Sequence, residues 1–473
     1  MDYCLRVVRE RVDAIGPALV ELHAGDRALK LVVFAHTPPP FHGQSYMVQL
    51  MLDGFGGDRR KSRGPTAPSA SGLECYHVNA RISKNLEDVG GIRFGKLVLL
   101  LFHCFQAIWC RFRYGATTFY YVPAPGKKVA LYRDWLVMGL CRPFFKRVIF
   151  HWHATNLSKW LETSTMMMTR SLTYRFMGQA DLSIVLSQYN RPIAEKLWPR
   201  RIAVVANGIP DPFPQFEQAA LPRRIARLAA RKKLAAGHQL TEREQAQAGA
   251  DPSVIRVFFL AHCTREKGLF DAVQATLLAN EKLRAQNSPL SLRLIVAGTF
   301  PDPNEKREFD RLCPGASLQA RDQDRDSASE RQHADASFEP SAPQSGPTAI
   351  QYAGFLQGPQ KSQAMLEADL LCFPSHWESF GVVLIEAMAF GLPMVTTRCT
   401  SVPDVVPPNY RGLADVGDPA QIAAALLDIA FYEDFTGLRQ HFLSHFTVAT
   451  FSSNLAAALH SIDAPPTGLT TSS

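Results

Sequence analysis

The sequence predicts an α/β fold made of two Rossmann-like domains. Short apolar runs rich in β-branched and aromatic residues alternate with helical stretches, which is typical of parallel sheets covered on both faces. In the first half of the chain these runs are residues 31–35, 118–122, 148–151, 182–186 and 203–205. In the second half they are residues 256–261, 292–297, 350–352, 370–373 and 394–397. The two sets indicate two domains with a hinge near residues 210–214.

A chain of 473 residues is long enough for two or three domains. The predicted parts are an N-terminal helical extension (1–30), a first Rossmann-like domain (31–210), a second one (211–440), and a C-terminal helix that returns to the first domain and ends in a flexible tail (441–473). The extension is inferred from an amphipathic spacing of apolar residues over residues 3–22.

Three stretches interrupt the alternation of strands and helices. Residues 56–72 form a basic loop rich in Gly, Pro and Ser, either simply solvated or binding a lipid or acceptor. Residues 222–236 read as a basic helix, which we expect on the surface. Residues 302–348 are polar and poor in core residues, so they cannot bury enough apolar surface to offset the entropy of ordering. We therefore predict a disordered insertion there.

Composition limits the partners and the compartment. The chain has a net charge of +8 and a pI near 9.0, which suits anionic small molecules or an anionic membrane face. No motif for nucleic-acid binding accompanies this charge, so we expect no nucleic-acid partner. The nine cysteines include no CxxC pair, which favours a reducing compartment and argues against structural zinc.

The sequence also bears on membrane attachment. No signal-peptide pattern opens the chain. The longest apolar run, residues 97–110, is shorter than the roughly 20 residues that a spanning helix needs. We expect a cytoplasmic protein that is soluble or in peripheral contact with an anionic membrane.

The segment FPSHWESFGVVLIEAMAFGLPMVTT carries the strongest functional signal. It places Glu378 and Glu386 eight positions apart, with Gly381 and Gly391 bracketing a short apolar helix. Glu386 has only apolar helical neighbours, so its carboxylate needs a partner. It either holds a nearby backbone group or Arg, or accepts hydrogen bonds from ligand hydroxyls. In the second case the amides near the helix start, at Ser379, Phe380 and Gly381, would face a phosphate.

This segment resembles the paired-glutamate motif of retaining glycosyltransferases with the GT-B fold, in particular the large family 4, or group 1. The resemblance implies two Rossmann-like domains facing across a cleft. It implies that Glu386 holds the ribose of a nucleotide-sugar and that Glu378 contacts the transferred sugar.

The resemblance extends to the second domain's other loops. Lys267-Gly268 match the family's Lys-Gly, where the cation neutralises the donor diphosphate. His262 occupies the position of the family's Arg, and Arg265 is the residue that could replace that second cation. Gly298 and Gly354 follow strands at positions that line the nucleotide pocket in the family.

Two positions of the first domain belong to the same pattern. Gly43 lies where the family often has a Gly-Gly pair facing the diphosphate, although Gln44 replaces the second Gly. His153 resembles the family histidine near the sugar. A strand-end histidine can equally be structural, and His151 at a spacing of two makes zinc binding conceivable, although no further ligand is near in sequence.

The resemblance implies an enzyme that moves a sugar from a nucleotide-sugar donor to a glycan, lipid-linked or small-molecule acceptor, with Glu378, His153 and Lys267 as catalytic residues. A nucleotide-sugar epimerase of the same fold and a catalytically inactive glycan- or nucleotide-binding protein are the alternatives. We expect no metal cofactor. Asp322 and Asp324 imitate a metal-binding DxD motif but lie inside the polar stretch 302–348.

Overall fold

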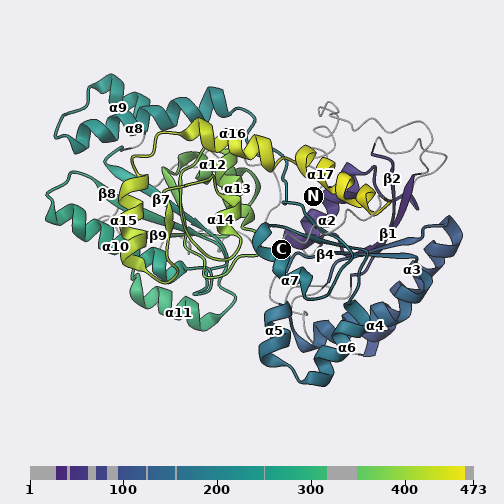
Figure 1. The fold of residues 1–473 in the computed structure, drawn as a ribbon. Coiled ribbons are helices and arrows are strands. Elements are labelled where there is room, and N and C mark those ends of the chain that lie inside the picture. The colour runs from purple at the N-terminus through teal and green to yellow at the C-terminus, as the bar shows by residue number, and fades with distance from the viewer. Residues whose placement is uncertain are drawn as a thin grey trace, which may run out of the picture. The chain divides into compact units, whose positions relative to one another are not determined.

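The computed structural model describes residues 28–39, 43–61, 71–81, 94–123, 126–154, 157–249, 251–316 and 349–463. The chain forms two compact units. Unit 1 comprises Met1–Pro210 and His445–Ser473, and unit 2 comprises Asp211–Ser444. Each unit contains one six-stranded sheet flanked by helices (Figure 1). The predicted α/β class with two Rossmann-like domains is confirmed.

The sheet of unit 1 is parallel throughout, in the order β2-β1-β3-β4-β5-β6. Its strands are β1 (Leu29–Ala35), β2 (Leu73–Asn79), β3 (Thr118–Tyr121), β4 (Arg147–His151), β5 (Leu182–Val185) and β6 (Ile202–Val204). The strand order reverses between β1 and β3, because β2 adds on one side of β1 and β3 adds on the other.

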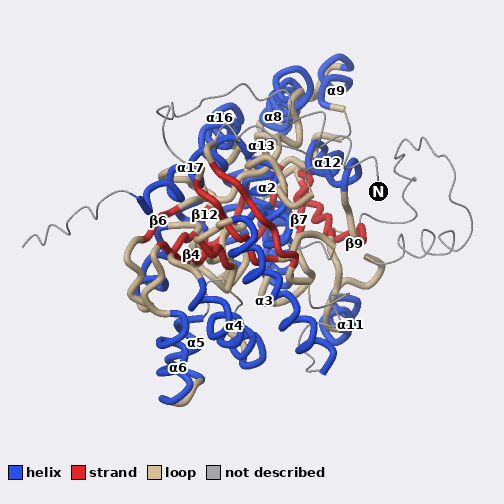
Figure 2. Tube along the Cα trace, turned by 90° about the vertical axis from the view of Figure 1, so that its right-hand side faces the viewer, coloured by secondary structure: helices blue, strands red, loops and turns tan. Residues whose placement is uncertain are grey.

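Helices cover both faces of this sheet. They are α2 (Gly43–Gly54), α3 (Phe94–Tyr114), α4 (Lys128–Cys141), α5 (Leu157–Ser164), α6 (Met167–Met177), α7 (Arg191–Glu195) and α17 (Val448–His460). α2 and α17 contribute to the core on one face, and α3, α4 and α5 contribute to the core on the other. α4 packs against α3 and α6, and Figure 1 and Figure 2 both show α4 beside α6.

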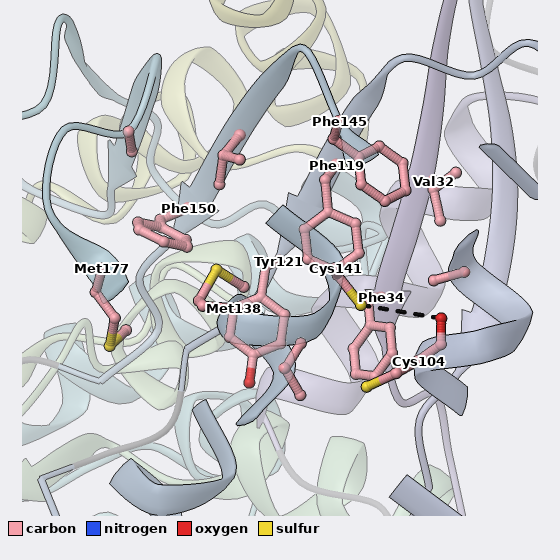
Figure 3. Close-up of a cluster of buried hydrophobic side chains, with 14 of the residues drawn as sticks. Val32, Phe34, Cys104, Phe119, Tyr121, Met138, Cys141, Phe145, Phe150 and Met177 are labelled. Atoms are coloured by element: carbon pink, nitrogen blue, oxygen red, sulfur yellow. Dashed lines mark hydrogen bonds between the residues drawn. The ribbon is translucent and has the colours of Figure 1, made fainter. Parts of the chain in front are cut away.

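The alternation of side chains along β1 explains how one strand serves both cores. Val32 and Phe34 enter the core under α3 and α4, while Leu31 and Val33 enter the core under α2 and α17. Figure 3 shows the first of these cores. The Cys141 thiol of α4 donates to the carbonyl oxygen of Cys104 in α3 at 3.9 Å, and aromatic rings of the strands pack around the two helices.

The sheet of unit 2 is also parallel, in the order β12-β11-β10-β7-β8-β9. Its strands are β7 (Val254–Leu260), β8 (Ser291–Ala297), β9 (Ile350–Gly354), β10 (Leu370–Phe373), β11 (Met394–Thr397) and β12 (Leu413–Ala414). Its helices are α8 (Leu221–Ala235), α9 (Glu242–Ala248), α10 (Leu269–Ala285), α11 (Pro303–Leu312), α12 (Gly358–Glu367), α13 (Val382–Ala389), α14 (Val402–Val405), α15 (Pro419–Ile429) and α16 (Phe435–His445). The strand order reverses between β7 and β10, as in a dinucleotide-binding sheet.

The basic helix α8 exposes one face but buries most of its arginines on the other, which corrects the expectation from its charge. Arg224, Arg227 and Arg231 share one face of α8 and are all buried. Arg227 Nε donates to Asp369 Oδ1 at 2.7 Å, and Arg231 Nη2 lies 2.6 Å from the same carboxylate. Arg224 donates to three backbone carbonyls, those of Phe390, Ala368 and Met365. These partners compensate for the burial of three guanidinium groups.

The prediction that residues 302–348 form a disordered insertion is wrong for its first part. Asp302 caps α11 by accepting from the backbone N–H of Asn304 at 2.8 Å, and the buried ring of Phe309 packs against Phe300 and Tyr352. Residues 317–348, including Asp322 and Asp324, lie outside the described residues.

The apolar run at 97–110 is part of a longer helix than we expected. α3 spans Phe94–Tyr114, and its stretch Gly95–Tyr114 has the length and apolar composition to cross a membrane. The apolar run stops at Arg111 in the sequence, but the helix continues to Tyr114, because a charged residue does not end a helix.

Other predicted segments fall partly or wholly outside the described residues. These are the N-terminal helix at 3–22, most of the basic loop at 62–70, and the tail from residue 464.

Candidate functional site

The candidate site of unit 2 is built at the carboxyl ends of β7 and β10. In open parallel sheets, ligands bind outside the carboxyl ends of the strands where the strand order reverses. The segment after β7 carries Lys267, and the segment after β10 carries Glu378. The topology of the sheet therefore brings together two segments that are more than 100 residues apart in sequence.

A close contact fixes the turn that carries Lys267. Gly268 adopts φ +76°, and a Cβ atom at this position would lie 2.0 Å from the carbonyl oxygen of Pro374. Only glycine fits both this backbone conformation and this approach. The turn before α10 therefore packs directly against the residue that follows β10.

Lys267 and Glu378 form an ion pair at this junction. Lys267 Nζ donates to Glu378 Oε1 at 2.5 Å and to the carbonyl oxygen of Trp377 at 3.3 Å. Both side chains retain some exposure, 27% for Lys267 and 11% for Glu378. A cation in this position can interact with an incoming anion, because it is neither fully buried nor freely solvated.

The backbone and side chain of Glu378 are held by hydroxyl groups. Thr400 Oγ1 accepts from the Glu378 backbone N–H at 3.1 Å and donates to its carbonyl oxygen at 2.5 Å. Ser401 Oγ donates to the same carbonyl oxygen at 3.0 Å. Ser375 Oγ lies within 3.3 Å of Glu378 Oε1. These contacts fix the position of the carboxylate before any ligand arrives.

The neighbouring residue His376 ties the same segment to α10. Its backbone N–H donates to the carbonyl oxygen of Glu266 at 2.8 Å, and its Nε2 lies 2.5 Å from Asp271 Oδ2. His376 therefore links the segment after β10 to the turn and the first part of the helix after β7.

Glu386 lies on α13 and has a partner that the sequence did not predict. Lys361 Nζ, from α12, donates to Glu386 Oε1 at 2.6 Å. Both side chains are partly exposed, at 31% for Lys361 and 19% for Glu386. The predicted alternative of a backbone or Arg partner is thus replaced by a Lys that lies 25 residues earlier in the chain.

The start of α13 carries the predicted amides at Ser379, Phe380 and Gly381. Gly381 is the residue before the first helical turn and adopts φ +87°, and the Phe380 side chain is buried. The N-terminal end of a helix is positive, so this end of α13 favours an anion.

Gly298 and Gly354 lie together at the ends of β8 and β9. The backbone N–H of Gly298 donates to the carbonyl oxygen of Gly354 at 2.8 Å, and the Tyr352 hydroxyl donates to the carbonyl oxygen of Gly298 at 2.8 Å. A Cβ atom at Gly298 would lie 1.7 Å from the carbonyl oxygen of Ala261. This glycine is required by the packing against the end of β7.

Arg265 does not join Lys267 in the structure. Its guanidinium pairs with Glu308 at 2.6 Å and lies 4.6 Å above the centre of the Phe270 ring. Its backbone N–H donates to Glu305 Oε1 at 2.8 Å. Both carboxylates come from α11, the helix within the stretch that was predicted to be disordered. His262, in turn, has Nδ1 3.2 Å from Thr299 Oγ1.

The candidate residues of unit 1 lie at the carboxyl edge of its own sheet. Gly43 begins α2 after β1, and among the described residues no atom lies within 4 Å of a Cβ built on it. His153 follows β4, with its ring centre 4.3 Å from that of His151. His151 is buried against the hydroxyl of Tyr120, and burial holds the pKa of His151 well below its ordinary value. His151 is therefore neutral near pH 7.

A zinc site at these histidines finds no support in the geometry. Among the residues that the structure describes, no three His, Cys, Asp or Glu side chains gather closely enough to hold a metal ion. His151 already faces Tyr120 through Nδ1.

Sequence reasoning missed the residues that position the site. Thr400, Ser401, Lys361 and the His376–Asp271 pair carry no local signal, because each becomes relevant only through a contact with a distant segment. The apolar helical neighbours of Glu386 were the one sequence feature that indicated a partner for its carboxylate.

Parts of the chain are similar in sequence to known proteins. Residues 256–430 match the family model described as glycosyl transferases group 1. Sulfoquinovosyl transferase of Arabidopsis thaliana is 41% identical over 61 residues, which are 13% of this chain and 12% of that protein. D-inositol 3-phosphate glycosyltransferase of Corynebacterium jeikeium is 38% identical over 106 residues, 21% of this chain and 25% of that protein. The matches thus span a quarter or less of these relatives.

Solved structures resemble the chain over a much longer stretch. Anabaena HepE, in complex with UDP and glucose, has a TM-score of 0.54 at 16% identity, over 91% of this chain and 99% of its own. The two parallel six-stranded sheets and this likeness define a GT-B fold. Within unit 2, residues 256–430 are similar to the glycosyl transferases of group 1.

Proposed function

We propose that this protein is a retaining glycosyltransferase that moves a sugar from a nucleotide-sugar donor to a glycan, lipid-linked or small-molecule acceptor. The observation that carries the proposal is the Lys267–Glu378 ion pair at the point where the strand order of unit 2 reverses. This pair lies inside the segment that matches the group 1 glycosyltransferases. It offers a cation where a diphosphate would bind and a fixed carboxylate beside it.

In this proposal the positively charged groups bind the leaving phosphate, and the carboxylate of Glu378 contacts the sugar. When the bond between sugar and diphosphate breaks, negative charge grows on the leaving phosphate and positive charge grows on the anomeric carbon. Lys267 and the amides at the start of α13 stabilise the phosphate, so catalysis rests mainly on positioned charges. Glu378 contacts the sugar, and its existing pairing with Lys267 keeps both groups in place before the donor binds.

Glu386 holds the ribose in this proposal. Its pairing with Lys361 orients the carboxylate and leaves both groups partly exposed, so that ribose hydroxyls can donate to it. Gly298 and Gly354 line the nucleotide pocket in this proposal. For Gly43 and His153 of unit 1, roles toward the diphosphate and the sugar are what the family resemblance implies. Retention of the anomeric configuration follows from the family resemblance, and no side chain is assigned as a nucleophile.

The proposal extends to the donor, the cellular compartment and the cofactor. UDP-glucose is the first donor to test, because HepE has been crystallised with that compound. We propose that the enzyme works in the cytoplasm and uses no metal cofactor.

The experiment is a screen of nucleotide-sugars by thermal shift and by release of nucleoside diphosphate, with wild type, Lys267→Ala and Glu386→Gln. Each variant should weaken donor binding or turnover by about 2–4 kcal/mol, or roughly 30- to 800-fold, because each removes a charge-assisted hydrogen bond. Lys282→Ala and Glu281→Gln on the exposed side of α10 are matched controls and should behave like wild type.

The same screen separates the alternatives. An epimerase would convert the donor without transferring its sugar to an acceptor. An inactive binding protein would show a thermal shift with nucleotide but no diphosphate release under any condition. If donor affinity and turnover are unchanged in both variants, the assignment of Lys267 and Glu386 is wrong.

A further inference from the structure

One face of α3 in unit 1 exposes large apolar side chains in a continuous stripe. We call this the α3 stripe. It consists of Leu97, Val98, Phe102, Phe105, Trp109 and Phe112. From Val98 onward the residues are spaced by four, three, four and three positions, so they lie on one side of the helix. Phe105 and Phe112 are each 68% exposed, although burying a phenylalanine is ordinarily favourable by about 1.5–3 kcal/mol.

The opposite side of α3 belongs to the core of unit 1. Leu100, Cys104, Ala107 and Cys110 are buried against the sheet. α3 is thus anchored to the domain along its length, and extracting it to span a bilayer would expose this core. The stripe can meet an apolar phase only along the helix side, over roughly 21 Å from Val98 to Phe112.

The apolar surface continues beyond α3. The exposed ring of Phe144 lies with its centre 6.1 Å from that of Phe112, and the Arg111 guanidinium donates to the Phe144 carbonyl oxygen at 3.1 Å. The stripe is therefore part of a wider surface that includes the turn after α4.

The sequence segment that contains this surface is almost uniformly basic. Residues 89–161 contain eleven Lys and Arg and a single acidic residue, Asp134. Asp134 is buried and paired with Tyr121 and Arg133, so it does not offset the positive charge at the surface. Because the whole chain carries +8, the remaining residues together carry −2. The net positive charge of the protein is concentrated in this segment.

The cations flank the stripe at both ends. Lys96 lies at the start of α3, and Arg111 and Arg113 lie in its last turn. α3 and α4 each connect consecutive parallel strands, so their first turns lie at the same edge of the sheet. Lys127 and Lys128, both exposed at the start of α4, therefore add to the positive charge at the Lys96 end.

We propose that the α3 stripe and its flanking cations dock unit 1 on an anionic lipid bilayer, with α3 lying in the plane of the interface. Apolar and aromatic side chains enter the boundary between headgroups and acyl chains, and the cations meet lipid phosphates. A second copy of this chain is a poor occupant. A symmetric contact through α3 would bring cations against cations, with no exposed acidic residue in this segment to pair with them.

The inference is independent of the proposed sugar transfer, because it uses no residue of the candidate site. Its test is sedimentation of the full-length protein with vesicles. Wild type should bind vesicles of equal parts phosphatidylglycerol and phosphatidylcholine, and should bind pure phosphatidylcholine at least about tenfold more weakly. Added salt should weaken binding to the anionic vesicles.

Two variants and their matched controls test the two components. Phe105→Asp with Phe112→Asp should lower affinity for the anionic vesicles at least about tenfold, whereas Ile225→Asp with Leu277→Asp, at exposed helical positions of unit 2, should not. Lys127→Glu with Lys128→Glu should also weaken binding at least about tenfold, whereas Lys282→Glu with Arg284→Glu, which change the net charge equally, should not. All positions are exposed, so melting temperatures should stay close to that of wild type.

Three results would overturn the proposal. One is equal vesicle binding by the α3 variants and their controls, and another is binding without preference for anionic lipid. The third is a wild-type dimer in solution that Phe105→Asp with Phe112→Asp converts to a monomer, since that would assign the stripe to a second copy of the chain.

Discussion

Single residues show how closely stability and the candidate site are joined in unit 2. Asp369, immediately before β10, accepts from the guanidinium of Arg227, lies 2.6 Å from Nη2 of Arg231, and accepts from the backbone N–H of Arg256. Burial alone would raise the pKa of Asp369, but Arg231 and Arg227 hold that pKa well below its ordinary value. The carboxylate is therefore charged at neutral pH, at the start of the strand that leads to Glu378.

Asp369→Asn should destabilise unit 2 by about 3–5 kcal/mol, because it leaves buried guanidinium groups without their counter-charge. The measurement is the free energy of unfolding from denaturant titration. Asp428→Asn removes a carboxylate that is 52% exposed and pairs with Arg411, and it is the matched control. The control should change stability by less than about 1 kcal/mol. Equal effects of the two substitutions would show that the buried cluster contributes no more than a surface pair.

Residues of the site differ in how well sequence predicts them. Lys267, Glu378 and Glu386 sit in compact motifs, so their resemblance to a family was visible within a few positions. Arg265 looked equally suitable, yet its charge is committed to Glu308 on α11. Lys361 could not be predicted, because its role depends on a contact with Glu386 of α13 and not on any local sequence pattern.

Helices and strands could be predicted where apolar strand runs alternate with helical stretches. They were harder to predict where a high content of charged residues suggested exposure to solvent. Strand runs such as 292–297 and 370–373 match β8 and β10 closely, because buried parallel strands are continuous apolar runs. In α8, the number of arginines suggested a solvated helix. Their spacing at 224, 227 and 231 marks a single face, and that face is buried on Asp369 and backbone carbonyls.

α11 leads to a prediction about the segment predicted to be disordered. Replacing residues 317–348 with a short Gly/Ser linker should leave the melting temperature and nucleotide binding nearly unchanged, since this sequence offers little apolar surface and loop-closure entropy grows slowly with length. Excising residues 305–345 should instead lower the melting temperature, because it removes Phe309 and the carboxylates that hold Arg265. Thermal unfolding of the two deletions side by side is the measurement.

Comparing the melting temperatures of the two deletion variants shows which part of the segment stabilises the fold. If the shorter deletion is as damaging as the longer one, residues 317–348 contribute to the fold. If both are harmless, α11 does not stabilise the turn before α10.

At the scale of the whole molecule, the two units have the same construction but different strand orders. Unit 2 has the order of a dinucleotide-binding sheet, and its reversal point holds the Lys267–Glu378 pair. Unit 1 holds the concentration of positive charge and the α3 stripe. The net charge and its concentration in residues 89–161 can be counted from the sequence. The exposed apolar face beside this charge could not be predicted, because exposure is a property of the folded domain.

In the proposed mechanism, positioned charges of unit 2 drive sugar transfer from a nucleotide-sugar without a metal ion. The most direct measurement is release of nucleoside diphosphate by wild type and Lys267→Ala in excess EDTA, with the donor found in the screen. Wild type should keep its activity in EDTA, and Lys267→Ala should lose roughly 30- to 800-fold. Asp322→Ala with Asp324→Ala should behave like wild type. Loss of activity in EDTA that Mn²⁺ or Mg²⁺ restores would contradict the account.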